Sequence, residues 1–266
     1  MTRILVLYYS SHGHVRALAQ AEAQGARSVP GVQVDLRRVP ETVPLAVRKR
    51  AGFQADDTPE AAVEELPQYD AIILGTPTHF GTMAGAVKQF IDQAGGLWAR
   101  NALAGKVGAV FTSTGSQHGG HEMTVLSTHV PLLHFGMVIV GMPYTFSGQT
   151  RQDGIVGGSP YGAGTIAGAD GSRRPTVTDL AGARFQGAHV ARVAAALAAA
   201  PQERYPSRPL PLWELASTEV GAIRSIIFQP GARPPSPWRS RCRRLGCCSQ
   251  ATTRCQRRRH RLSPMW

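Results

Sequence analysis

Four stretches of the chain are mainly apolar over a length typical of a β-strand: residues 4–9, 69–75, 106–114 and 137–141. Such runs indicate strands that are buried on both faces of a parallel sheet. Residues 32–39 instead alternate between apolar and polar positions, which predicts a strand with one less buried face. The pattern therefore predicts five strands.

Stretches with helical periodicity separate these strands. They cover residues 15–27, 84 to about 93, the segment after residue 122 up to about 134, and 179–200, with a Gly-Gly break before Trp98. Strands that alternate with helices imply right-handed crossovers. We therefore predict a doubly wound α/β domain with helices on both faces of a parallel sheet, and a ligand at the carboxyl ends of the strands.

Two segments lack a clear pattern. Residues 40–67 are rich in Pro and charge, and residues 144–178 are rich in Gly. Both are predicted to be loops with little regular structure. Loops of this length are usually functional or belong to interfaces.

Three predicted strands run into loops rich in Gly, Ser, Thr and His. They are loop 1 (residues 10–15, SSHGHV), loop 2 (residues 76–83, TPTHFGTM) and loop 3 (residues 112–120, TSTGSQHGG). If they converge at one edge of the sheet, they favour a bound cofactor over simple connections. Loops 2 and 3 contain no carboxylate, which favours a flat heterocycle with Phe80 or Trp98 near its faces. His118 and His121 have no Cys or HExxH motif beside them, so we predict no metal site.

Loop 1 brings two hydroxyl groups to the N-terminus of a helix, where free backbone N–H groups favour a phosphate. The loop contains no Lys and does not match GxGxxG, which argues against a Walker-type site and a dinucleotide fingerprint. Neutral donors suit a phosphate monoester. A Ser N-cap after a buried strand explains this stretch about equally well.

Charge is concentrated at the end of the chain. Of the net charge of +12, residues 202–266 contribute +10, with 13 Arg, no Lys and three Glu, and they hold all four cysteines. Residues 1–201 therefore contain no disulfide, which is typical of a cytosolic protein. No apolar stretch approaches the roughly 20 residues of a membrane span. We expect a cytoplasmic domain over residues 1–200 and a disordered Arg- and Pro-rich tail over residues 201–266.

Four longer stretches carry a family resemblance: YYSSHGHV, ILGTPTHFGTMAGAVKQFIDQAGGLW, the Ser-Thr-Gly loop followed by HGGHEMT, and GGSPYGAGTIAGADGSRRPT. Over residues 1 to about 200 the chain resembles the WrbA flavoproteins, which are type IV NAD(P)H:quinone oxidoreductases. The resemblance implies a flavodoxin-like five-stranded sheet in the order 2-1-3-4-5, non-covalent FMN and a homotetramer. It also implies two-electron reduction of quinones by NADH or NADPH.

The resemblance also implies roles for individual residues. It assigns Ser10, Ser11, Gly13, His14 and Val15 of loop 1 to the FMN phosphate, and Thr78, His79 and Phe80 to the ribityl chain and ring. His12 of loop 1 is also counted among the cofactor-binding residues. It assigns Ser113, Thr114, Gly115, Ser116, Gln117 and His118 to the isoalloxazine edge. His134 matches a flavin-pocket histidine, and Trp98 matches the aromatic residue that packs over the ring and touches the quinone. Without the resemblance, core packing would be the preferred interpretation of Phe80, Trp98 and His134.

Two positions depart from the family pattern. The family often has Tyr at position 12 and Arg at position 79, where this chain has His12 and His79. A Tyr that helps to seat the nicotinamide is therefore missing, and a fixed cation is replaced by a titratable one. The preference between NADH and NADPH is left open.

Two other functions are considered. A flavodoxin-type electron carrier would not turn over substrate and would usually expose its flavin edge on an acidic surface, whereas residues 1–201 are nearly neutral. The Arg-rich tail could bind nucleic acid. Its Arg without Lys and its clustered Cys look more like arbitrary GC-rich translation than a binding arm, so nucleic-acid binding is the least favoured function.

Overall fold

A parallel β-sheet forms the centre of the protein in the computed structural model, which describes residues 1–200. Along the sheet the order is β2-β1-β3-β5-β6. The bounds are β1 (Thr2–Tyr8), β2 (Val32–Arg38), β3 (Ala71–His79), β5 (Val107–Thr114) and β6 (Val138–Ile139). Counting these five in chain order gives 2-1-3-4-5, which confirms the predicted flavodoxin-like α/β fold. The predicted disordered tail, and with it the nucleic-acid hypothesis, lie outside the described residues.

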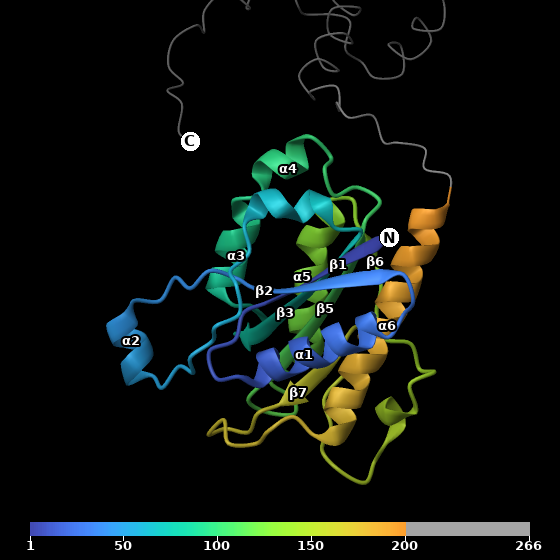
Figure 1. Ribbon diagram of the computed structural model, residues 1–266. Helices are drawn as coiled ribbons and strands as arrows, with labels where there is room; N and C mark the ends of the chain where they lie inside the picture. The colour runs from blue at the N-terminus through green and yellow to red at the C-terminus, as the bar shows by residue number, and fades with distance from the viewer. Residues whose placement is uncertain (201–266) are drawn as a thin grey trace, which may run out of the picture. The chain divides into compact units, whose positions relative to one another are not determined.

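Both faces of the sheet are apolar, because side chains alternate along each strand. In β1, Ile4, Val6 and Tyr8 enter one core, and Leu5 and Leu7 enter the other. The first core is covered by α1 (His14–Arg27) and α6 (Val177–Ala199), and the second by α3 (Gly85–Asp92) and α5 (His121–His134). Helices therefore cover both faces of the sheet, as predicted (Figure 1).

The packing of α1 on α6 brings the two helix backbones unusually close. A Cβ atom added to Gly25 would lie 1.9 Å from the carbonyl oxygen of Arg184, and one added to Gly187 would lie 2.1 Å from that of Glu22. Only glycine fits at these two crossing points. A capping box starts α6, since the Thr176 hydroxyl accepts from the N–H of Asp179 and the Asp179 carboxylate accepts from the N–H of Thr176.

The fifth position of the sheet differs from the prediction of one strand over residues 137–141. It is shared by β6, which pairs with the start of β5, and by β7 (Gly164–Ile166), which pairs with Thr112, Ser113 and Thr114 at its end. Between them the chain leaves the sheet edge and returns at Gly162, where an added Cβ would lie 2.0 Å from the carbonyl oxygen of Val110. Residues 144–178 are therefore not one irregular loop, and they also contain the 3₁₀ turn η2 (Ser147–Thr150).

Short elements also replace other predicted irregular segments. Residues 40–67, predicted to have little regular structure, contain α2 (Leu45–Arg50) and the start of η1 (Val63–Gln68). The Gly-Gly pair, predicted to be a break, begins α4 (Gly95–Ala99), and loop 2 contains β4 (Thr82–Met83), which pairs antiparallel with the end of β3. All of these elements are short, so sequence periodicity gives little signal for them.

Glu22 is an acidic residue that is buried in the protein core. Its side chain on α1 is fully buried at the contact with α6, and neither carboxylate oxygen has a hydrogen-bond partner among residues 1–200. This burial raises the pKa of Glu22 well above its ordinary value. Burial in this helix interface therefore favours the protonated, uncharged form of the Glu22 carboxyl group.

Replacing Glu22 with Val should stabilise the protein at neutral pH by about 1–3 kcal/mol, the cost of a buried polar group without a partner. Because the pKa of Glu22 is raised, the folded state binds more protons than the unfolded state once the pH exceeds the unfolded value of 4.5. Stability should then fall as pH rises between the unfolded and folded pKa values. Chemical denaturation across this range, in wild type and Glu22→Val, measures both effects.

Glu22→Gln serves as the matched control, since it keeps a polar group of the same size but does not titrate. It should flatten the pH dependence without the full gain in stability. Parallel stability profiles for wild type and Glu22→Gln would contradict the assignment of this pH dependence to Glu22.

Candidate functional site

Loops 1, 2 and 3 leave the carboxyl ends of β1, β3 and β5, which are neighbours in the sheet. The N–H of Tyr9 donates to the carbonyl of Gly75 at 3.0 Å, which fixes loop 1 beside β3. Loop 3 touches loop 2, because a Cβ added to Gly120 would lie 3.0 Å from Cα of Gly81. The structure therefore brings the three loops together at one edge of the sheet.

Loop 1 presents an open helix N-terminus. Gly13 precedes α1 in the left-handed conformation, with φ of 85°, and its N–H donates to Oγ of Ser10 at 3.1 Å. No side chain caps the helix, so the N–H groups of its first turn lack intrahelical partners. His14 is buried, its Nε2 has no partner among the described residues, and burial followed by the charge of Arg174 lowers its pKa. Unpaired donors beside a neutral imidazole suit an anion.

The other loop 1 residues take different positions. Val15 is buried in the core, so only its backbone can face a ligand. The carbonyl of Ser11 accepts from the N–H of Gln54 at 2.9 Å. The ring of His12 meets the edge of Phe53, with the ring centroids 5.5 Å apart. Loop 1 is therefore held from outside by residues that follow α2.

Loop 2 carries a strained aromatic residue. Phe80 has φ of 54°, a left-handed conformation that is costly for a residue with a Cβ, and its ring is fully exposed. Thr78 shares a hydrogen bond with Thr124 of α5, which joins the loop to that helix. His79 lies at the end of β3, and partial burial lowers its pKa. Burial therefore favours the uncharged form of His79.

Loop 3 ends in a second open helix N-terminus. Gly120 precedes α5 in the left-handed conformation, with φ of 90° and no side-chain cap. Ser113 and Thr114 are buried, and the Thr114 hydroxyl donates to the carbonyl of Ser116 at 2.8 Å. Gly115, Ser116, Gln117 and His118 are exposed along the loop. The loop therefore offers backbone groups and small polar side chains to a ligand.

His121 was not predicted to act in this site, yet it fixes loop 3. The buried imidazole lies with Nδ1 3.3 Å from Oγ1 of Thr114, and its Nε2 accepts from the N–H of Gly158 at 3.2 Å. Accepting at Nε2 places the proton of the neutral ring on Nδ1, facing Thr114. Burial lowers the pKa of His121, which favours this neutral form. The contact with Gly158 is distant in sequence, so spacing alone gave no signal for it.

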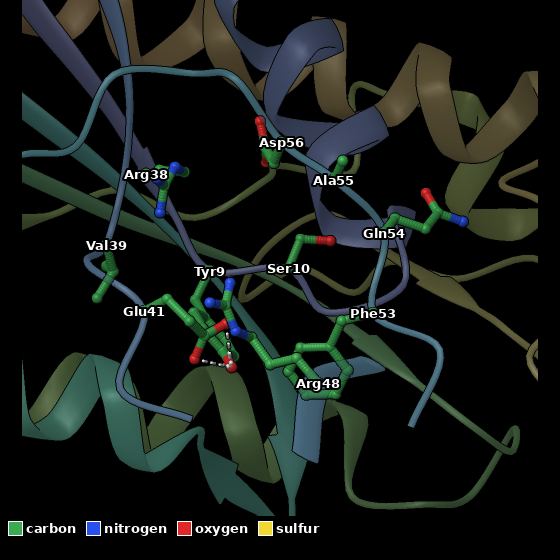
Figure 2. Close-up of a pocket in the computed structure, with 10 residues that line it drawn as sticks. All are labelled: Tyr9, Ser10, Arg38, Val39, Glu41, Arg48, Phe53, Gln54, Ala55 and Asp56. Carbon is green, nitrogen blue, oxygen red and sulfur yellow. Dashed lines mark hydrogen bonds between the residues drawn. The ribbon is translucent and has the colours of Figure 1, made fainter. Parts of the chain in front are cut away.

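The segment of residues 53–58, which we call the strap, lies over loop 1 and was also not predicted. The hydroxyl of buried Tyr8 donates to Oδ2 of Asp56 at 2.7 Å, and Arg16 donates to the carbonyl of Ala55 at 2.7 Å. Between the strap and loop 1 is a cavity of about 90 Å³. Figure 2 shows its lining residues, Tyr9, Ser10, Arg38, Val39, Glu41, Arg48, Phe53, Gln54, Ala55 and Asp56. The one sequence signal for the strap was the buried Tyr8, whose hydroxyl needs a partner.

Trp98 lies in α4 and His134 at the end of α5, so neither residue belongs to loop 1, 2 or 3. Both line a groove of about 660 Å³ that is also lined by residues of β4, α3 and α5. His134 is the last residue of α5, about 20 Å along the helix from loop 3. Within one chain Trp98 and His134 therefore share a groove with the end of loop 2, at Thr82 and Met83, while His134 lies far from loop 3.

The residues at the loops fit a ligand that carries a phosphate. Two uncapped helix N-termini, each preceded by a left-handed glycine, and the orphaned Nε2 of His14 lie at the ends of these strands, and loops 1, 2 and 3 contain no carboxylate that would repel an anion. Within residues 1–200, no group of three or more His, Cys, Asp or Glu side chains is arranged to hold a metal ion. No helix in the same range is both long and apolar enough to cross a membrane.

Gly120→Ala should lower the free energy of unfolding by about 1–3 kcal/mol, because a Cβ at this φ is strained and presses on Gly81. The same displacement separates loops 2 and 3, so FMN should bind more weakly. Chemical denaturation and quenching of FMN fluorescence measure the two effects. Gly154→Ala is the control, because an added Cβ there meets nothing within 4 Å. Equal losses in both variants would refute a special role for the contact between loops 2 and 3.

Comparisons with known proteins identify the family. The family model of NADPH-dependent FMN reductase matches residues 2–152. The NAD(P)H dehydrogenase (quinone) of Paracoccus denitrificans (strain Pd 1222) is 62% identical over 202 residues, which are 75% of this chain and 97% of that protein. NAD(P)H dehydrogenase (quinone) 3 of Rhizobium meliloti (strain 1021) is 60% identical over 200 residues, which are 74% of this chain and 94% of that protein.

A solved structure supports the fold. The flavodoxin, WrbA-like protein from Agrobacterium tumefaciens superposes with a TM-score of 0.54 at 24% identity, covering 74% of this chain and 99% of that one. The residues that the family model matches, 2–152, include all three loops. The chain therefore belongs to the NADPH-dependent FMN reductase family.

Proposed function

We propose that this protein is an FMN-dependent NAD(P)H:quinone oxidoreductase that reduces quinones to hydroquinones by transfer of two electrons. The observation that carries the proposal is the meeting of two uncapped helix N-termini with loop 2 at the ends of three adjacent strands. The names of relatives at 60% and 62% identity, NAD(P)H dehydrogenase (quinone), support the reaction.

In this proposal the three loops bind different parts of FMN. The hydroxyls of Ser10 and Ser11 and the first-turn N–H groups of α1 bind the phosphate. Loop 2 contacts the ribityl chain and ring through Thr78, His79 and Phe80. Ser113 to His118 of loop 3 border the ring edge, and the backbone N–H groups of residues 115–120 would stabilise negative charge on its pyrimidine side without a buried Lys.

In this proposal the protein positions the flavin ring and forms the cavity in which the substrates bind. Bound FMN would supply the hydride-transfer chemistry between the nicotinamide and the quinone. The residues of the three loops fix the ring, so that one cavity receives first NADH or NADPH and then the quinone. This shared use of the cavity gives ping-pong kinetics. The cytoplasmic location expected from the cysteine distribution is part of the same proposal.

Steady-state oxidation of NADH or NADPH with benzoquinone by the FMN-loaded protein tests the enzyme function. We expect turnover well above that of the same concentration of free FMN, and parallel lines in double-reciprocal plots. A yellow protein that binds FMN but gives no more turnover than free FMN would instead be an electron carrier, and the enzyme proposal would be withdrawn.

The same proposal includes a homotetramer, supported by the apolar surface of α5. Met123, Leu126, Val130 and Leu133 are exposed at helical spacing and form a stripe along the helix. Such a stripe marks an interaction surface. Trp98, 52% exposed, lines the neighbouring groove with Val130. If the groove of one copy covers the loops of another, Trp98 and His134 can contact the flavin of that other copy.

Replacing Leu133 with Asp should therefore shift the protein toward smaller assemblies, because it places a charge in the stripe. Analytical ultracentrifugation measures this change. FMN should still bind, since the three loops belong to one chain, while quinone reduction should fall several-fold. Leu197→Asp, an equally drastic change at a partly exposed position on α6, is the control. A tetramer that survives Leu133→Asp unchanged rules out this stripe as the assembly surface.

A further inference from the structure

Outside loop 1 there is a second cavity, which we call the Arg174 groove. It has a volume of about 420 Å³ and begins at Gly13, where α1 starts. Its lining includes Gly13, Arg16, Gln20, Gln54 and Arg174. The groove is therefore continuous with the helix N-terminus that is proposed to bind the FMN phosphate. This location matters because loop 1 itself contains no Lys or Arg.

Two neighbouring arginines reach this region from the segment before α6, and they differ in their contacts. Arg173 donates to the carbonyls of Ile166 and Ile155 and lies 3.8 Å from the buried carboxylate of Asp179. Arg174 is exposed and makes no hydrogen bond or ion pair within residues 1–200. Arg173 therefore holds its segment in place, while Arg174 is left to bind something else.

The side chain of Arg174 lies near the start of α1. Its charge is the second cause, after burial, of the lowered pKa of His14, the first residue of α1. Arg174 also lines the groove together with Gly13, on the outer side of the same helix turn. Its guanidinium is thus within electrostatic reach of the point where the first-turn N–H groups of α1 converge.

The other charges in the groove are already partly compensated. Arg16 lies 3.9 Å from Asp56 and donates to the carbonyl of Ala55, so it fastens the strap. Asp56 also accepts from Tyr8. Asp57, which is exposed in the strap, is the remaining carboxylate in the lining and opposes an anion. Arg174 is the cation of this groove that has no assigned structural contact among the described residues.

We propose that Arg174 binds the 5′-phosphate of FMN from outside α1 and makes the site selective for FMN over riboflavin. The inference rests on the proposed function and extends it, because loop 1 offers only neutral donors to a phosphate that is mostly doubly charged at neutral pH. A guanidinium can donate two parallel hydrogen bonds to phosphate oxygens, which an ammonium group cannot. The phosphate is then held between helix N–H groups on one side and one fixed cation on the other.

Titration of the apo-protein with FMN and with riboflavin tests this inference, with flavin fluorescence as the readout. Arg174→Gln should weaken FMN binding about three- to ten-fold, a modest loss because the contact is partly open to solvent and screened. Riboflavin binding should not change, since it lacks the phosphate. Arg174→Lys should keep the charge and lose only part of the affinity for FMN. Added salt should weaken FMN binding more in wild type than in Arg174→Gln.

Arg192→Gln is the matched control. It removes the same charge from an exposed position on α6, about 20 Å along the helix from its start, and should leave both flavins unaffected. Equal losses for FMN and riboflavin in Arg174→Gln, or no loss for either, overturn the inference while the FMN-binding function stands. Failure of the wild type to bind either flavin overturns the proposed function and this inference with it.

Discussion

The carboxylate of Asp179 organises the part of the domain that encloses the loops. It is buried at the start of α6 and accepts hydrogen bonds from the N–H of Gly157 at 2.7 Å, the hydroxyl of Thr165 at 2.9 Å and the N–H of Thr176 at 2.9 Å. A buried carboxylate is tolerated only when its oxygens are satisfied in this way. Gly157 precedes Gly158, which donates to His121, so the same cluster also fixes loop 3. The hydrogen bonds of this cluster therefore join residues 157–158, β7 and loop 3 to the start of α6.

Local patterns were sufficient for most of the fold. Strands buried on both faces give long apolar runs, so β1, β3 and β5 and the helices between them could be predicted from periodicity. The division of the fifth strand position between β6 and β7 could not be predicted in this way. Residues 138–139 and 164–166 are too short to show a period, and their pairing with β5 depends on the close approach of Gly162 to Val110. That contact joins segments far apart in the sequence, and a glycine gives no sign of what its backbone will touch.

The residues of the candidate site also fall into those that could be predicted from local sequence and those that could not. Loops 1, 2 and 3 could be predicted because each follows a recognisable strand, and a parallel sheet brings such ends together. His121, the strap and Arg174 could not, since their contacts come from other parts of the chain. The resemblance assigned Trp98 and His134 to the flavin site without saying which copy they come from. A helix of 14 residues carries its last side chain about 20 Å from its first, so His134 cannot lie beside loop 3 of its own chain.

The proposed site relies on groups that do not titrate near neutral pH. Helix N-termini act as fixed partial charges, and the lowered pKa values of His14 and His121 favour the neutral form of both imidazoles. His79 differs, because its pKa is also lowered but it lies at the end of β3, where an approaching anion can raise it. Because the flavin gains and loses charge during the proposed reaction, groups whose own charge stays constant can hold the phosphate throughout. His79 is then a loop residue through which pH can act on a bound cofactor.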